Sequence, residues 1–165
     1  MKLRPYSKED AKTILSWSVD ERAFYKWCAG VIGDYPATEK EFAFVENLIA
    51  FTAYDESGIV GFFTMRQPDL SKNILRAGFV IVDPTKRGQG LGKKMLSLAL
   101  KYAFEEHKAD EVSLGVFENN EPAYYCYKAA GFEEVVLDEV ESYKVLGEEW
   151  KCIEMRIRNP YKYRY

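Results

Sequence analysis

Residues 87–92, with the sequence Arg-Gly-Gln-Gly-Leu-Gly, carry the strongest chemical signal in the chain. They lie between a predicted apolar strand and a predicted amphipathic helix. Three glycines in six residues remove side chains from the turn, so the backbone N–H groups of the first helical turn can point at an anion. Arg87, Lys93 and Lys94 add positive charge at the same place. The turn is therefore predicted to hold a phosphate group.

Two common nucleotide motifs do not fit this turn. A Walker A loop would need glycine at position 87, which is Arg, and Ser or Thr at position 94, which is Lys. A Rossmann fingerprint needs G-x-G-x-x-G, and the spacing of Gly88, Gly90 and Gly92 is one residue too short. A glycine-rich turn without a ligand stays an alternative. Against it, residues 86–108 hold six Lys or Arg and two Asp or Glu.

The pattern R-x-x-G-x-G after the strand-like residues 79–84 resembles the acyl-CoA binding motif of the GNAT (GCN5-related N-acetyltransferase) family. In that family the amides of the turn hold the coenzyme A pyrophosphate, and the end of the preceding strand pairs with the pantetheine arm. The resemblance implies that Ile81 and Val82 bind the arm. The pyrophosphate residues that it implies are Arg87, Gly88, Gln89, Gly90, Gly92 and Lys93. A helix N-terminus also carries about +0.5 charge, which favours such an anion.

A second segment, residues 120–132, resembles the GNAT pattern N-x-x-A-x-x-x-Y-x-x-x-G-F. The resemblance implies that Asn120 bonds the pantetheine and that Tyr127 is the general acid and lies in the cofactor site. Attack of an amine on a thioester expels a thiolate whose conjugate acid has a pKa of about 8.5, and a phenol with a pKa near 10 can protonate it. Tyr124 is a weaker candidate acid, and a packing role for Tyr127 stays open. The resemblance covers roughly residues 48–158.

The general base is less clear. The predicted strand over residues 75–82 holds no carboxylate, and the one over residues 111–117 has only Glu111, at its far end. Glu118 follows that strand at the expected active-site end and is the candidate base. A solvated loop position for Glu118, with a water chain or a backbone carbonyl as the base, is the alternative.

The resemblance places the acceptor between residues 18–34 and residues 141–150. The candidate acceptor residues are Asp20, Glu21, Trp27 and Asp34 in the first segment and Glu141, Tyr143, Glu148, Glu149 and Trp150 in the second. Residues 133–149 contain seven acidic residues and one lysine. Acidic and aromatic surfaces favour a cationic amine, although an ordinary acidic hairpin is equally open. Peptide N-termini, lysine side chains, polyamines and amino-sugars all remain candidate acceptors.

Hydrophobic periodicity and turn residues predict the elements of the fold. Strands are expected over residues 2–6, 48–54, 59–66, 75–82, 111–117, 132–140 and 151–158, and helices from Ser7, over 20–28, near Thr38, over 91–104 and from Pro122. This order and the resemblance imply an α+β, GNAT-like fold with a mixed, mostly antiparallel central sheet flanked by helices on both faces. Residues 1–165 form one predicted domain, with a flexible tail at 158–165.

Composition bounds the remaining possibilities. The chain has 165 residues, of which 47% are hydrophobic and 30% charged, as in a soluble globular protein. The net charge of −3 argues against a general nucleic-acid partner. Three dispersed cysteines, no signal peptide and no apolar run near 20 residues predict a cytoplasmic protein without a membrane partner. His107 is the single histidine, so no metal site is expected.

The predicted function is transfer of the acetyl group of acetyl-CoA, without a metal, to a primary amine by direct attack. A small-molecule or peptide amine is the expected partner, with a homodimer as a further possibility. The first alternative is a non-catalytic coenzyme A-binding module that senses or docks another molecule. A weaker alternative is an enzyme that acts on a nucleotide phosphate.

Overall fold

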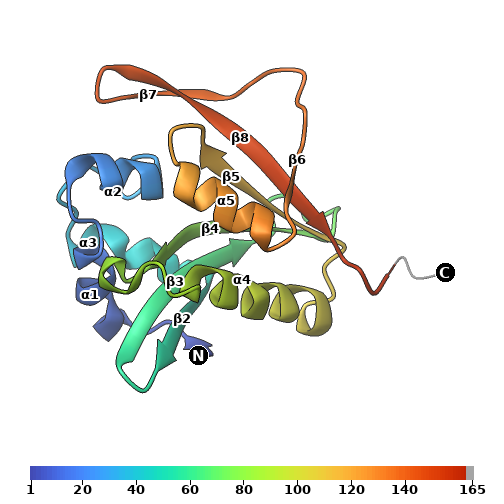
Figure 1. Cartoon of the computed structure of the whole chain (residues 1–165), viewed down its shortest axis with the longest axis horizontal. Helices are drawn as coiled ribbons and strands as arrows, with labels where there is room; N and C mark the ends of the chain where they lie inside the picture. The colour runs from blue at the N-terminus through green and yellow to red at the C-terminus, as the bar shows by residue number, and fades with distance from the viewer. Residues whose placement is uncertain (163–165) are drawn as a thin grey trace.

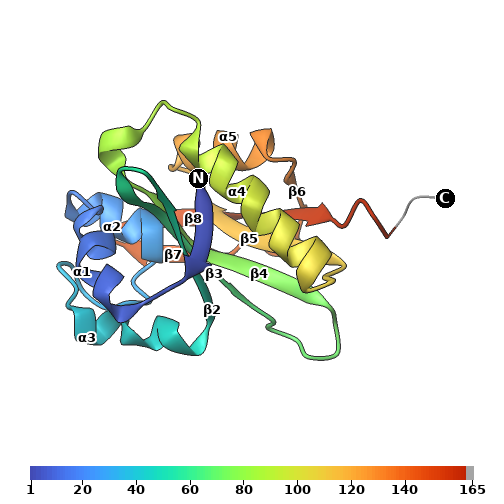
Figure 2. The ribbon, with the colours of Figure 1, turned by 90° about the horizontal axis from the view of Figure 1, so that it is seen from below.

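The computed structural model describes residues 1–162. One sheet runs through the molecule, with helices on both of its faces (Figures 1 and 2). The strands are β1 (Lys2–Pro5), β2 (Ile49–Asp55), β3 (Gly58–Arg66), β4 (Ile74–Val82), β5 (Glu111–Phe117), β6 (Glu133–Glu134), β7 (Ser142–Val145) and β8 (Glu148–Arg158). The helices are α1 (Ala11–Ser16), α2 (Glu21–Cys28), α3 (Glu39–Phe42), α4 (Leu91–Lys101) and α5 (Glu121–Ala129). Among the described helices, none is long and apolar enough to span a bilayer.

The strand order is β1-β2-β3-β4-β5-β8-β6, with β7 paired to β8. All pairs are antiparallel except β4 and β5, which are parallel. A parallel pair needs a crossover, and here α4 supplies it. The predicted α+β fold, with a mixed and mostly antiparallel sheet, is confirmed.

Two hydrophobic clusters fill the two faces of the sheet. On one face Met95, Leu96 and Ala99 of α4 pack against side chains of β3, β4 and β5. On the other face the first three helices bury Phe24 and Phe42, among others, against Phe62 and Ile81 of the sheet. Met95 and Ala99 are both buried because positions four residues apart share one face of a helix.

The prediction of a strand over residues 132–140 is wrong. Only Glu133 and Glu134 pair as a strand, and residues 135–141 form a loop that is exposed over most of its length. Acidic side chains at 138, 139 and 141 have no buried face to alternate against, so pairing stops. The last hairpin instead joins β7 to β8 through Leu146 and Gly147, whose φ angles of 52° and 75° suit a two-residue hairpin turn.

The predicted tail at residues 158–165 begins within ordered structure. Arg158 is the last residue of β8, and Asn159 is 1% exposed. The Asn159 Nδ2 group donates to the carbonyl of Ala109 at 2.8 Å. The tail is thus anchored at its start, and residues 163–165 lie outside the described part of the chain.

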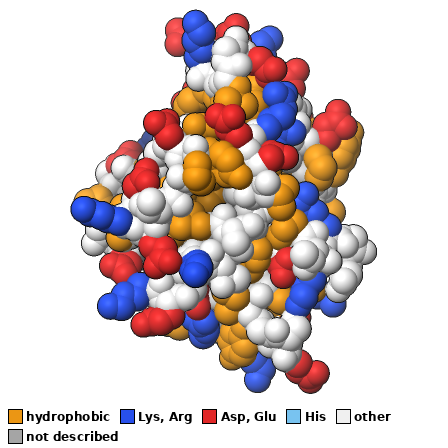
Figure 3. All heavy atoms as spheres, turned by 90° about the vertical axis from the view of Figure 1, so that its left-hand side faces the viewer, with side chains coloured by type: hydrophobic (Ala, Val, Ile, Leu, Met, Phe, Trp, Pro, Cys, Tyr) orange, Lys and Arg blue, Asp and Glu red, His pale blue; other side chains and the backbone are white. Residues whose placement is uncertain are grey.

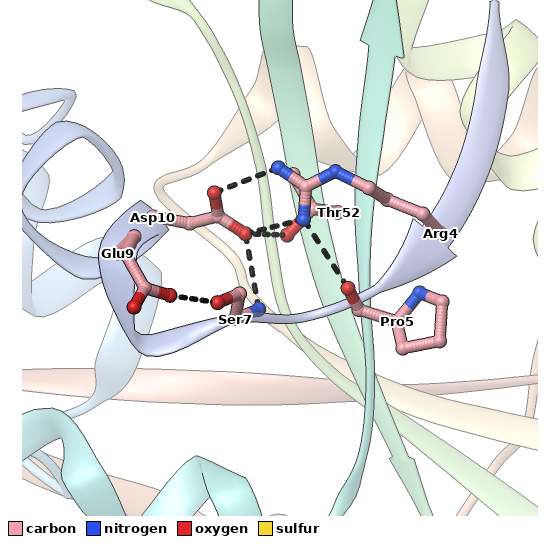
Figure 4. A network of polar contacts seen from close by, with 6 residues as sticks. All are labelled: Arg4, Pro5, Ser7, Glu9, Asp10 and Thr52. Carbon is pink, nitrogen blue, oxygen red and sulfur yellow. Dashed lines mark hydrogen bonds and ion pairs between the residues drawn. The ribbon is translucent and has the colours of Figure 1, made fainter.

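A carboxylate network fastens the N-terminal segment to the sheet (Figure 4). Asp10, which is 7% exposed, accepts two hydrogen bonds from the Arg4 guanidinium at 2.7 and 2.8 Å. It also accepts from the Thr52 hydroxyl at 2.9 Å and from the Ser7 N–H at 3.1 Å. Burial opposes ionisation of Asp10, but these donors outweigh it and lower its pKa. The network therefore joins β1, the turn before α1 and β2.

We predict that Asp10→Asn lowers the free energy of unfolding by about 2 kcal/mol at pH 7, because it leaves Arg4 without its charged partner. The folded pKa of Asp10 lies below its unfolded value of about 3.9, so the ionised carboxylate stabilises the fold above that pH. The difference between Asp10→Asn and the wild type should shrink as the pH falls through the folded pKa. Urea unfolding between pH 3 and 7 measures this. Glu56→Gln, in the exposed β2–β3 turn, is the control, and an equal loss there would contradict the prediction.

Candidate active site

The pairing of β4 with β5 stops part-way along both strands. The last paired residues are Arg76 and Ser113, and the strands diverge beyond them. Beside this opening β4 contains a bulge, where Phe79 and Val80 together oppose the single residue Phe63 of β3. Phe79 has a φ of 51°, a left-handed backbone that is unfavourable for an aromatic residue and common at functional sites. The facing edges of β4 and β5 are therefore free to meet a ligand.

A cavity of about 570 Å³ occupies the opening. Residues of β4, β5, the glycine turn, α5 and the segment from α1 to α2 form its wall. Figure 3 views the molecule from the side on which α1, α2 and α3 lie in Figure 1, and hydrophobic side chains gather at the centre of that face with charged groups around them. The predicted residues in the wall are Ile81, Val82, Arg87, Gly88, Gly90, Gly92, Lys93, Asn120 and Tyr127. The opening thus brings together parts of the chain that are far apart in sequence.

The glycine turn meets the cavity at the start of α4. Gly88 and Gly90 have φ angles of 81° and 72°, and no atom lies within 4 Å of a Cβ built on either residue. A Cβ on Gly92 would lie 3.0 Å from the Cys126 sulfur of α5, so this glycine also allows two helices to approach. The first hydrogen bond of α4 runs from the Lys94 N–H to the Gly90 carbonyl at 3.1 Å. The three preceding N–H groups have no acceptor within the helix and remain available to an anion.

Basic side chains surround those free N–H groups. Lys86, Arg87 and Lys93 line the cavity. Gln89 and Lys94 are exposed and do not contribute to the wall. Positive charge and oriented N–H groups together form an anion site at this end of the cavity.

Tyr127 lies in the cavity wall on α5. It is 8% exposed and packs edge-on against Phe132, with ring centroids 6.0 Å apart. Burial raises the pKa of Tyr127 well above its usual value, with a smaller contribution from Cys126. The phenol therefore keeps its proton at neutral pH and can serve as a proton donor. Asn120, the N-cap of α5, makes no capping hydrogen bond through its side chain.

The other two candidate acid and base residues lie outside the wall. The Tyr124 hydroxyl donates to Glu134, and the Lys128 ammonium lies 5.8 Å from the centre of its ring. Glu118 is exposed, and its N–H donates to the Lys151 carbonyl at 2.9 Å. The structure thus brings Tyr127 into the cavity and leaves Tyr124 and Glu118 outside it.

Few of the residues predicted to bind the acceptor reach the cavity wall. Of the acceptor candidates, only Asp20 and Trp27 line the wall. Glu148 forms an ion pair with Arg22 at 3.2 Å and accepts a hydrogen bond from Trp150 Nε1 at 2.7 Å. The Arg22 guanidinium also lies 5.1 Å from the centre of the Trp150 ring. The Arg22 guanidinium therefore joins α2 to the β7–β8 hairpin.

Sequence reasoning missed Arg22 and Lys26, two cations of α2 that line the cavity. They are four residues apart, so they share one face of the helix. That spacing was visible in the sequence, but an exposed helix face shows the same pattern. Only the position of α2 over the open sheet makes them part of a site.

Comparison with known proteins agrees with this geometry. The family model described as "Acetyltransferase (GNAT) family" matches residues 11–132. The chain belongs to this family. The match covers both predicted motifs, which confirms the resemblance seen in the sequence.

The chain is also similar to the spermine/spermidine N(1)-acetyltransferase of Bacillus subtilis (strain 168), at 32% identity over 85 residues. That match covers 48% of this chain and 56% of the relative, so the chain spans about half the length of the curated relatives it matches.

Two solved structures share the fold at low identity. Spermidine N-acetyltransferase from Vibrio cholerae, in complex with CoA and spermine, has a TM-score of 0.80 at 18% identity and covers 96% of this chain and 95% of its own. Ribosomal-protein-alanine N-acetyltransferase from Brucella melitensis has a TM-score of 0.74 at 18% identity and covers 96% and 99%. Proteins that share this fold thus bear names with different acceptors.

We predict that Gly90→Ala lowers the free energy of unfolding by about 1–2 kcal/mol, because a Cβ is unfavourable in the left-handed backbone. The space around this position is open, so the loss comes from the backbone alone. Gly90→Asn is the matched control and should lose less, since Asn tolerates this conformation. Urea unfolding measures both, and equal losses for the two variants would contradict the prediction.

Proposed function

We propose that the protein transfers the acetyl group of acetyl-CoA to a primary amine by direct attack. The observation that carries the proposal is one continuous cavity between an anion site at the start of α4 and the buried, protonated phenol of Tyr127. Membership of the GNAT family supports it, as does the CoA complex of the Vibrio cholerae enzyme with the same fold.

The wall fits the parts of coenzyme A in chemical terms. We propose that the pyrophosphate is held by the free N–H groups of α4 and by the side chains of Arg87 and Lys93, with Gly88, Gly90 and Gly92 leaving the approach open. The pantetheine arm would lie along the unpaired edge of β4 at Ile81 and Val82, with Asn120 on the opposite side. The amides of that arm can then replace the strand pairing that β5 does not provide.

The reaction needs three proton and charge events at the opening. The amine nitrogen bonds to the thioester carbon, and the carbonyl oxygen gains negative charge that unpaired N–H groups of β4 can stabilise. Collapse of this intermediate breaks the carbon–sulfur bond and releases a thiolate. We propose that Tyr127 gives its proton to that sulfur, and that the attacking nitrogen loses its own proton.

The sequence left Glu118, a water chain and a backbone carbonyl open as the route by which the amine loses its proton. The carboxylate in the wall is Asp20, which already accepts the Ala23 N–H at 2.8 Å as the N-cap of α2. Glu118 lies outside the wall, and its action as the base is the alternative to the route proposed next. We propose that water removes the proton, so the rate should rise with pH as the neutral amine becomes more abundant.

We predict that Tyr127→Phe lowers kcat by about 100-fold or more, because general acid catalysis is lost. The Tyr127 hydroxyl has no hydrogen-bond partner among residues 1–162, so the variant should fold and bind acetyl-CoA as the wild type does. Release of coenzyme A thiol over a panel of amines measures the effect. Tyr124→Phe is the matched control and should keep nearly full activity, as should Glu118→Gln. Full activity of Tyr127→Phe would remove this tyrosine as the acid.

We predict that acetyl-CoA raises the melting temperature, since a ligand at 100 times its Kd stabilises a protein by about 2.7 kcal/mol. ATP and NAD should have a much smaller effect, because neither has a pantetheine arm. A shift with ATP alone would contradict the proposal and favour action on a nucleotide phosphate.

A shift with acetyl-CoA but no thiol release for any amine would favour the alternative, a non-catalytic coenzyme A-binding module. The relatives named for spermine and spermidine make polyamines the reference compounds for the amine panel. A homodimer, a cytoplasmic location and the absence of nucleic-acid partners stay predictions from the sequence.

A further inference from the structure

We propose that the acceptor amine carries a carboxylate close to its reactive amino group, as an amino acid does, and that a polyamine is a poor acceptor. The inference rests on the proposed function and names the substrate class of the same site. It concerns the acceptor end of the cavity, where the segment from Trp17 to Trp27 faces the opening in the sheet.

The charges of α2 at this end favour an anionic group. Arg22 and Lys26 line the cavity from the same helix face, against the single carboxylate of Asp20. Asp20 is engaged as the N-cap of α2. Among the described residues, Lys26 makes no ion pair. Arg22 already pairs with Glu148, so Lys26 is the cation of α2 that lines the cavity without an acidic partner.

The β7–β8 hairpin, whose acidic and aromatic side chains could bind a polyamine, already contacts Arg22 of the same chain. Arg22 pairs with Glu148 and covers the ring of Trp150, the arrangement by which a cationic substrate would be held. Glu149 accepts a hydrogen bond from the Ser142 hydroxyl at 2.8 Å. An ammonium group that bound at this pair would compete with Arg22 for both of its partners.

Two polar atoms of the wall residues lack partners. The Ser18 hydroxyl and the Trp27 indole N–H are buried and make no hydrogen bond within the described structure. Ser18 is 6% exposed, and Trp27 packs against Phe79, the residue at the β4 bulge, with ring centroids 6.2 Å apart. An indole N–H can only donate, so it needs a ligand with a lone pair. A carboxylate offers several lone pairs, whereas a protonated polyamine offers none.

The position of these donors places the carboxylate beside the reaction. Trp27 adjoins the bulge at which β4 and β5 are already apart, and the thioester would lie along that edge. A group that meets Trp27, Ser18 and Lys26 therefore lies a short distance from the attacking nitrogen. A carboxylate on the carbon next to the amine satisfies this arrangement.

The test compares matched acceptors with and without the carboxylate: leucine, leucinamide and isoamylamine, with spermidine as the polyamine. Rates are expressed per concentration of neutral amine, because the carboxyl group also changes the amine pKa. We expect kcat/KM for leucine to exceed that for isoamylamine by at least about ten-fold, the size of one charge-assisted hydrogen bond, with leucinamide between them and spermidine lowest.

Variants of the wall connect this preference to named residues. Lys26→Met should reduce the preference for leucine over isoamylamine about ten-fold, and Trp27→Phe should reduce it while keeping an aromatic ring. The KM for acetyl-CoA should not change in either variant. Lys101→Met, at an exposed position near the end of α4, is the matched control and should keep the preference of the wild type.

The phosphate monoester of coenzyme A could supply the same anionic chemistry, so acetyl-dephospho-CoA is included as a second donor. If Lys26→Met raises the KM for acetyl-CoA but not for acetyl-dephospho-CoA, Lys26 binds that phosphate and the inference is wrong. A preference for isoamylamine or spermidine over leucine also overturns it, while leaving the proposed function intact. Binding of acetyl-CoA without transfer to any amine overturns the proposed function, and this inference with it.

Discussion

Hydrogen bonds between β4 and β5 end at Arg76 and Ser113, and the functional architecture depends on where they end. Arg76 Nη1 donates to Ser113 Oγ at 3.2 Å and to Glu154 of β8 at 2.9 Å, which joins three strands at the last paired position. Gly115 permits this reach, since a Cβ there would lie 3.1 Å from Arg76 Nη2. The pairing is thus held firmly on one side of this point and absent on the other, and the cavity opens at a defined place.

Several backbone features beside the opening between β4 and β5 are unfavourable in isolation. The left-handed backbone of Phe79 and the unpaired edges of two central strands both cost free energy in an ordinary sheet. At the glycine turn, Gly90 also adopts a left-handed backbone, and the first N–H groups of α4 lack partners. These groups line one cavity, where a single extended ligand can satisfy hydrogen bonds at both ends.

Contact between α2 and the last hairpin changes which charges are available near the proposed acceptor end of the cavity. Arg22 pairs with Glu148 and lies over the ring of Trp150, so one carboxylate and one aromatic ring of the hairpin are engaged by a cation of the same chain. The charge that remains in the wall comes mainly from cations, including Lys26. None of residues 133–149, all of which the structure describes, lines the cavity wall, so a count of their acidic side chains does not describe that wall.

The sequence by itself indicated the GNAT family through its two motifs and the α+β fold through its hydrophobic periodicity, because both depend on local patterns. Glycine spacing predicted the turn at residues 87–92, the resemblance to the family pattern singled out Asn120 and Tyr127, and residues of both motifs line the cavity. Tertiary structure decided the rest. The short β6, the exclusion of Glu118 and the pairing of Arg22 with Glu148 depend on contacts between segments up to 126 positions apart. Local sequence does not encode such contacts, because a charged side chain in a loop or on a helix face acquires its role only from the surface that folds against it.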